Sequence, residues 1–123
     1  MRTTTDVIES HLHLRKIGDL ERDLAENYDD EVVLLSWGEG VHRGPDGVRH
    51  LATVLNTYLP EGNYEYHDVL IEGSYGMLRW TGTARSATVH DGADSYVVQH
   101  GRIVAQSIYY AVSYPENRAT VRT

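Results

Sequence analysis

The N-terminal third of the chain carries the pattern that most restricts the fold, two helical stretches followed directly by an apolar strand. Apolar residues at helical spacing predict a helix over residues 6–16, which Gly18 ends. Asp19 is a suitable N-cap for a second helix over residues 19–27. After an acidic turn, the apolar run of residues 31–37 predicts a strand covered on both faces. This third therefore predicts a domain that combines helices with a sheet.

The remainder of the chain predicts one more helix and then only strands. Residues 38–44 are a Gly-rich loop, and Pro45 suits the first turn of a third helix that ends before Pro60. Asp91-Gly92 is a hairpin signal, and His100-Gly101 is a further turn. The predicted strands are residues 64–72, 77–89, 93–99 and 102–113. We expect an α+β fold in which a strongly curved antiparallel sheet and three helices form a cone around a pocket.

Length and charge limit the classes of protein. The chain of 123 residues fits a single domain, which we place at residues 1–113, with residues 114–123 as a flexible tail. A formal net charge of −7 argues against nucleic acid or an anionic membrane as a partner. The absence of cysteine excludes disulfides and thiol nucleophiles. No apolar run spans a membrane or forms an export signal, so we expect a cytoplasmic location.

Two polar residues lie on the face of the first helix that should be buried. His11 and Arg15 share that arc with Val7, Ile8 and Leu14. His11 fits a pocket acid, base or hydrogen-bond donor, or a core histidine that a neighbouring carboxylate satisfies. Arg15 fits a clamp for a substrate oxyanion, or a residue that is solvated or paired with Asp19 or Glu72. Each residue is therefore a candidate for the site, with a structural alternative.

Strand alternation predicts which side chains line the pocket. The chain has nine tyrosines, two tryptophans and no phenylalanine, a composition that suits a cavity with polar atoms on an apolar wall. The candidate wall residues are Leu35, Trp37, Trp80, Tyr96, Val98, Gln106, Ile108 and Tyr110. The alternative is that these side chains fill the cone completely.

Several motifs resemble one known superfamily. The segments Gly18-Asp19-Leu20, Tyr28-Asp29-Asp30 and Arg43-Gly44-Pro45 resemble its N-terminal half, and Arg79-Trp80-Thr81 and Gly101-Arg102-Ile103 resemble its C-terminal half. The family is the nuclear transport factor 2-like superfamily (a cystatin-like fold), in its SnoaL-like branch, which includes polyketide cyclases and is related to ketosteroid isomerase. The resemblance covers about residues 5–113, and it implies a cone-shaped domain that commonly forms homodimers through the sheet.

The resemblance also assigns roles to positions. His11 occupies the position of the first-helix oxyanion donor of ketosteroid isomerase, and Asp94 that of the second donor. The position of the isomerase base is Leu35 here, and the His and Asp of the cyclases' last strand correspond to Gln106 and Ile108. The chain therefore matches the family in its scaffold and in the two polar residues His11 and Asp94, but it lacks the carboxylate and imidazole bases of the family's enzymes.

These observations lead to one main hypothesis and one alternative. The main hypothesis is a cofactor-free isomerase, cyclase or hydratase that acts by general acid–base chemistry on an apolar, oxygenated, polyketide- or steroid-like molecule, with His11 and Asp94 as catalytic residues. Asp94 could instead be a solvated residue beside a turn. The alternative is a non-catalytic protein that binds a ligand or forms a dimer, with its sheet contact near residues 79–88. The histidines are scattered and the Gly-rich loop fits no nucleotide motif, so we expect neither a metal nor a cofactor.

Overall fold

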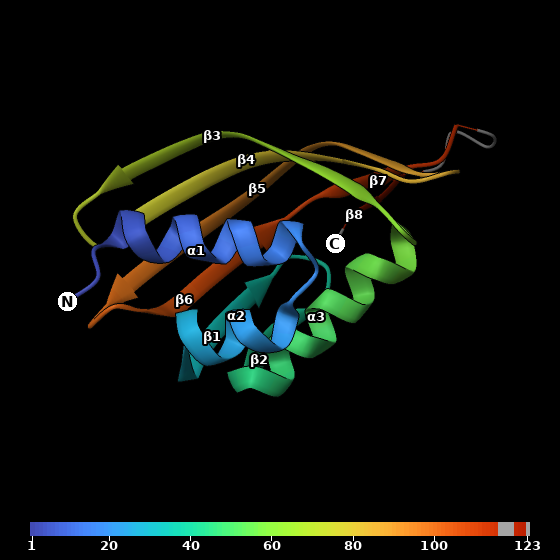
Figure 1. The fold of residues 1–123 in the computed structure, drawn as a ribbon. Coiled ribbons are helices and arrows are strands. Elements are labelled where there is room, and N and C mark those ends of the chain that lie inside the picture. Colours follow the sequence, from blue (N-terminus) through green and yellow to red (C-terminus); the bar gives the residue numbers. More distant parts are fainter. Residues whose placement is uncertain (116–119, 123) are drawn as a thin grey trace.

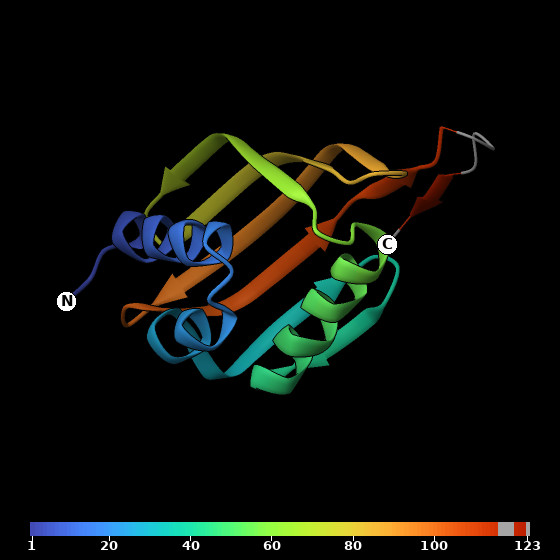
Figure 2. The same ribbon diagram turned by 45° about the vertical axis from the view of Figure 1, so that its right-hand side comes forward.

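A curved sheet with three helices on its concave side forms the protein (Figure 1), and this confirms the predicted α+β class. The computed structural model describes residues 1–115 and 120–122. Figure 2 shows α1 lying across the sheet at one end, while α2 and α3 lie beside β1. The helices and the concave face of the sheet enclose the interior of the cone.

A local sequence signal lies at the start of each helix, a capping side chain for α1 and α2 and a proline for α3. Helix α1 (Thr4–Lys16) starts two residues earlier than predicted, because Thr3 and Asp6 form a capping box in which each side chain accepts a hydrogen bond from the other's backbone N–H. Helix α2 (Leu20–Asn27) has Asp19 as its N-cap, as predicted. Helix α3 (Gly44–Tyr58) has Pro45 in its first turn.

The strands form one mixed sheet in the order β2-β1-β6-β5-β4-β3. Their bounds are β1 (Tyr28–Ser36), β2 (Gly40–Arg43), β3 (Asn63–Glu72), β4 (Tyr75–Thr83), β5 (Thr88–Gln99), β6 (Arg102–Tyr109), β7 (Ala111–Ser113) and β8 (Thr120–Arg122). The sheet is not purely antiparallel as predicted, because β1 lies parallel to β6. That pair joins distant parts of the chain, so a pattern of consecutive hairpins could not indicate it.

The hairpin predicted at Asp91-Gly92 is wrong, because β5 runs straight through these residues. The connection from β4 to β5 lies instead at residues 84–87, where Ala84 N–H donates to the carbonyl of Ala87. Gly92 serves a packing purpose: a Cβ there would lie 2.2 Å from Cε2 of Trp80. The glycine therefore allows the indole to lie flat against β5.

The predicted Gly-rich loop and the predicted tail both contain strand residues. β2 pairs antiparallel with β1 across the turn at residues 37–39. β8 pairs with β7, while residues 116–119 and 123 of the predicted tail lie outside the described residues. In the described part of the chain, no helix has the length and apolar character needed to cross a membrane.

Candidate functional site

A cavity lies between the helices and the concave face of the sheet. Its volume is about 100 Å³. The polar side chains on its wall are His11, Arg15, Tyr28, Ser36, Tyr64, Tyr66, Trp80, Asp94, Tyr96, Gln106 and Tyr110. Leucine, valine, alanine and isoleucine side chains from α1, α3, β1, β4 and β6 form the rest of the wall. Helix α3 thus contributes only apolar side chains to the wall, while the polar ones come from α1, the strands and Tyr110.

Asp94 is the carboxylate on the cavity wall. One oxygen, Oδ1, accepts a hydrogen bond from Trp80 Nε1 at 3.1 Å, and Oδ2 accepts from Gln106 Nε2 at 3.1 Å and from the Tyr96 hydroxyl at 3.4 Å. Burial raises the pKa of Asp94, although these hydrogen bonds and the nearby charges of His11 and Arg15 oppose that rise. A carboxylate offers about four acceptor positions, so Asp94 keeps one for a ligand.

The ring of His11 is hydrogen-bonded, on the side away from the cavity, to a buried carboxylate on α2. Its Nδ1 lies 2.7 Å from Oδ2 of Asp23, which is fully buried. Oδ1 of Asp23 accepts from Asn27 Nδ2 at 2.8 Å, and Asn27 in turn accepts from Arg2 at 2.8 Å. Asp23 thereby orients the imidazole and leaves Nε2 pointing toward the cavity.

Tyr96 joins the histidine to the aspartate. Its hydroxyl lies 3.2 Å from His11 Nε2 and 3.4 Å from Asp94 Oδ2. Burial, and then the charge of Asp94, holds the pKa of Tyr96 well above its usual value, so the hydroxyl stays protonated. Asp23, His11, Tyr96 and Asp94 therefore form one continuous hydrogen-bonded series that ends in the cavity.

Arg15 contributes a cation on the same wall. It is half-buried and forms no hydrogen bond or ion pair with any side chain in the described part of the chain, so the ion pairs considered with Asp19 or Glu72 are absent. Its charge nonetheless opposes the rise that burial causes in the pKa values of Asp94 and of tyrosines on the wall. An unpaired guanidinium beside an apolar cavity favours an anionic or strongly polarised oxygen on a ligand.

The family model of the SnoaL-like domain matches residues 9–106. The chain belongs to the SnoaL-like domain family. The match includes residues 9–16 of α1, the whole of α2 and β5, and most of β6, and therefore all four residues of the Asp23–His11–Tyr96–Asp94 series. A search of the curated proteins gives no match to this sequence.

Solved structures with the same fold include a nuclear transport factor 2-like protein and a SnoaL-like protein. A proposed SnoaL-like polyketide cyclase from Jannaschia sp. CCS1 is similar with a TM-score of 0.74 and 13% identity, covering 86% of this chain and 85% of that one. A nuclear transport factor 2-like protein of unknown function from Cytophaga hutchinsonii ATCC 33406 gives 0.70 and 15%, covering 89% and 91%. TerC, co-crystallised with polyporic acid, gives 0.71 and 14%, covering 87% and 90%. These identities establish a shared fold.

The predicted wall is right for some positions and wrong for others. Trp80, Tyr96, Gln106, Ile108 and Tyr110 line the cavity. Three other predicted wall residues do not: Leu35 is 50% exposed on the outer face, Trp37 is 81% exposed in the turn after β1, and Val98 is buried in the core away from the cavity.

The error on β1 has a simple geometric cause. Leu34 and Ser36 face the cavity, so the position that we matched to the isomerase base, Leu35, points outward. A shift of one residue reverses the face of every side chain on a strand. The β1 residues that line the cavity still carry no carboxylate, because their polar groups are the hydroxyls of Tyr28 and Ser36.

Sequence reasoning missed Asp23, Asn27 and Tyr28, although a signal was present. Leu20 and Leu24 mark the buried side of α2, and Asp23 and Asn27 lie at the intervening helical positions on that side. A buried polar pair one turn apart, next to a buried histidine on the preceding helix, indicates a hydrogen-bonded network.

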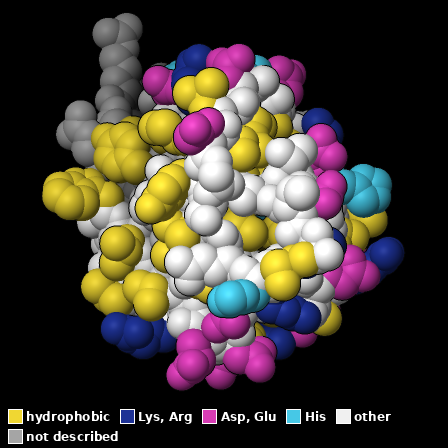
Figure 3. All heavy atoms as spheres, turned by 90° about the vertical axis from the view of Figure 1, so that its left-hand side faces the viewer, with side chains coloured by type: hydrophobic (Ala, Val, Ile, Leu, Met, Phe, Trp, Pro, Cys, Tyr) yellow, Lys and Arg dark blue, Asp and Glu magenta, His cyan; other side chains and the backbone are white. Residues whose placement is uncertain are grey.

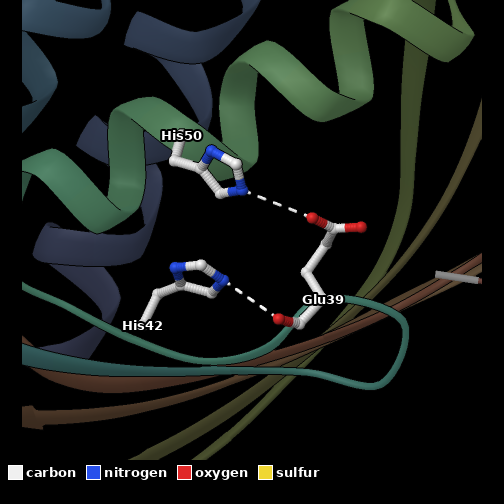
Figure 4. Close-up of side chains that lie close together, drawn as sticks. All are labelled: Glu39, His42 and His50. Carbon is white, nitrogen blue, oxygen red and sulfur yellow. Dashed lines mark hydrogen bonds and ion pairs between the residues drawn. The ribbon is translucent and has the colours of Figure 1, made fainter.

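The description of the histidines as scattered is wrong for His42 and His50. Their rings stack with centroids 4.7 Å apart, and Glu39 lies beside both (Figure 4). The pairing depends on the packing of β2 against α3, which spacing along the chain does not reveal.

Proposed function

We propose that the protein binds a small, apolar or aromatic, oxygenated molecule in the cavity and transfers a proton on it without a cofactor. The reaction would be of the isomerase, cyclase or hydratase type. The observation that supports this most strongly is the hydrogen-bonded series Asp23–His11–Tyr96–Asp94, which ends at a cavity carboxylate whose pKa is raised.

The series supports two arrangements of a single proton. With the proton on Asp94, the carboxyl donates to the Tyr96 oxygen and the Tyr96 hydroxyl donates to Nε2 of His11. With the proton on His11, Nε2–H donates to Tyr96 and Tyr96 donates to the Asp94 carboxylate. In the second form Asp94 acts as the base that removes a proton from a carbon next to a ligand carbonyl. Arg15 then stabilises the oxyanion that develops on that carbonyl.

The cavity volume limits the ligand. An apolar cavity of about 150 Å³ accommodates a benzene ring, so a cavity of about 100 Å³ favours a ligand with at most one ring. This is smaller than the steroid-like ligand that the resemblance implied.

Isotope exchange tests the proposal directly. A panel of one-ring ketones is incubated in D₂O with the wild type, Asp94→Asn and Tyr96→Phe, and deuterium next to the carbonyl is followed by NMR. We expect exchange with the wild type, a loss of about 10²-fold or more with Asp94→Asn, and a smaller loss with Tyr96→Phe. Asp91→Asn removes an exposed carboxylate from the same strand and serves as the matched control.

Non-catalytic ligand binding is the second candidate. It is favoured by the absence of a carboxylate or imidazole on the cavity-lining positions of β1 and β6, which in the described structure are Tyr28, Leu34, Ser36, Gln106 and Ile108. Saturable binding of the same ketones without any exchange above the buffer rate would reject catalysis and leave this candidate.

We also propose that two copies pair through the outer face of the sheet. A groove of about 560 Å³ lies there, and Leu35, Leu70, Tyr75 and Met77 on its rim are all 47–69% exposed. Hydrophobic side chains gather along the left side of the view in Figure 3. Arg79, where we predicted the contact, is instead paired with Asp68 and Asp91. The proposed contact is therefore displaced from residues 79–88 toward the β3–β4 hairpin.

Light scattering after size exclusion tests this pairing. We expect a dimer for the wild type and a folded monomer for Leu70→Asp, because a charge on the apolar patch opposes its burial. A monomeric wild type at high protein concentration would reject the proposal.

A cytoplasmic location stays a prediction from the sequence.

A further inference from the structure

A second cluster of polar side chains lies outside the cavity, where the β1–β2 turn meets α3. Glu39 comes from the turn, His42 from β2 and His50 from the second turn of α3. Figure 4 shows both imidazole rings reaching toward Glu39, one to its carboxylate and one to its backbone carbonyl. None of the three residues lines the cavity, so the cluster is separate from the site described above.

The donor atoms are already close to the spacing of a metal site. One ring nitrogen of each histidine and one carboxylate oxygen of Glu39 all lie within 4.8 Å of one another. The distance from His50 Nε2 to Glu39 Oε1 is 3.3 Å. Two ligands bonded at about 2.0 Å to a tetrahedral ion lie about 3.3 Å apart. The cluster therefore needs only a small side-chain adjustment, chiefly of His42, to surround one ion.

The backbone around the cluster brings the two rings together. A Cβ at Gly47 would lie 3.1 Å from the Cβ of His42, so this glycine lets β2 approach the first turn of α3 closely. The close approach stacks His42 on His50 with an interplanar angle of 28°. Two stacked imidazoles beside a carboxylate concentrate three metal-ligand groups on one small area, and the net charge of −7 also favours cations.

We propose that Glu39, His42 and His50 bind a divalent transition-metal ion of the zinc type. Two imidazole nitrogens and one carboxylate oxygen are borderline ligands that suit Zn²⁺, Co²⁺, Ni²⁺ and Cu²⁺ rather than Mg²⁺ or Ca²⁺. Water completes the coordination, because the protein supplies three ligands. The ion fastens the β1–β2 turn to α3, and Glu39 N–H also donates to the hydroxyl of Ser36 on the cavity wall. Metal binding thus restrains a turn that is hydrogen-bonded to a residue of the cavity wall.

Titration of tag-free protein with Zn²⁺ tests the proposal. Isothermal titration calorimetry should give one ion per chain with the wild type, and at least tenfold weaker binding with His50→Ala and with Glu39→Gln. His13→Ala removes an exposed histidine on α1 and should bind like the wild type. Co²⁺ provides a second probe, because its visible absorption should appear with the wild type and His13→Ala but not with His50→Ala.

Two further readouts separate specific binding from other causes. Circular dichroism should show the same fold for all variants, since the three side chains are half-buried or exposed. Zn²⁺ should raise the melting temperature of the wild type, and EDTA should reverse the rise. No binding up to about millimolar Zn²⁺ would overturn the proposal, and so would binding that is equal in His50→Ala and the wild type.

Discussion

The two faces of the sheet carry different chemistry although the same strands build both. On the inner face, Asp94, Tyr96 and Gln106 hydrogen-bond to one another and to other cavity residues. On the outer face, their neighbours Ser95, Val97 and Ala105 line a shallow apolar groove. The inner face is organised by hydrogen bonds between distant parts of the chain, and the outer face by exposed apolar area. This difference is the basis for our two proposals, a small molecule on the inner face and a second copy of the chain on the outer face.

Removing Asp23 should weaken the inner face most. Asp23→Ala leaves His11 and Asn27 buried without their shared acceptor, and we expect a loss of about 3 kcal/mol in the free energy of unfolding. Glu26→Ala, on the same helix, breaks only an exposed ion pair with Arg22 and should cost less than about 1 kcal/mol. Chemical denaturation measures both, and equal losses would show that the buried series does not stabilise the fold.

Two adjacent leucines on β1 compare the faces most directly. Leu34 is 1% exposed, whereas Leu35 is 50% exposed. We expect Leu34→Ala to cost about 3 kcal/mol and Leu35→Ala less than about 1 kcal/mol. Denaturation at low protein concentration, where a dimer would dissociate, gives the two values. A larger cost for Leu35→Ala would mean that the faces of β1 are assigned the wrong way round.

The same pair shows where sequence reasoning stops. Gly18 and Asp19 are local signals, so the end of α1 and the start of α2 were predictable. Residues 32–35 are Val-Val-Leu-Leu, a run without alternation, so the pattern could not indicate which leucine faces inward. We set the parity from Trp37, which lies in the turn beyond the strand and is exposed. The strand was predictable because it depends on composition, but its facing depends on tertiary packing.

The residues of the site also fall into those that the sequence indicated and those that only the packing reveals. His11 stood out because it interrupts an apolar helical face, and Asp94 because of the resemblance. Asp23 and the Glu39–His42–His50 cluster depend on contacts between elements, α1 with α2 and β2 with α3. Such contacts follow from the packing of whole elements and leave little trace in local spacing.

Gly92 tests how tightly the inner face is packed. In Gly92→Ala the new methyl group would meet the indole of Trp80, and we expect a loss of about 2 kcal/mol in the free energy of unfolding. In a Trp37→Phe background, the fluorescence of Trp80 alone should also shift as the ring moves. Ser95→Ala, three residues further along β5 and on the outer groove, should change neither measurement. An unchanged fluorescence in Gly92→Ala would show that the ring has room.

The pH dependence of stability gives the smallest and most specific test of the inner face. Because burial raises the folded-state pKa of Asp94, its contribution to stability is complete below the unfolded value of about 3.9 and is lost as pH rises through the folded value. The free energy of unfolding of the wild type, relative to Asp94→Asn, should therefore fall as pH rises above about 4. Trp80→Phe removes a hydrogen bond that lowers this pKa, so the fall should extend to higher pH. Denaturation at several pH values measures the difference. A difference that grows in favour of the wild type would mean that hydrogen bonds outweigh burial at Asp94, and would leave it a poor base.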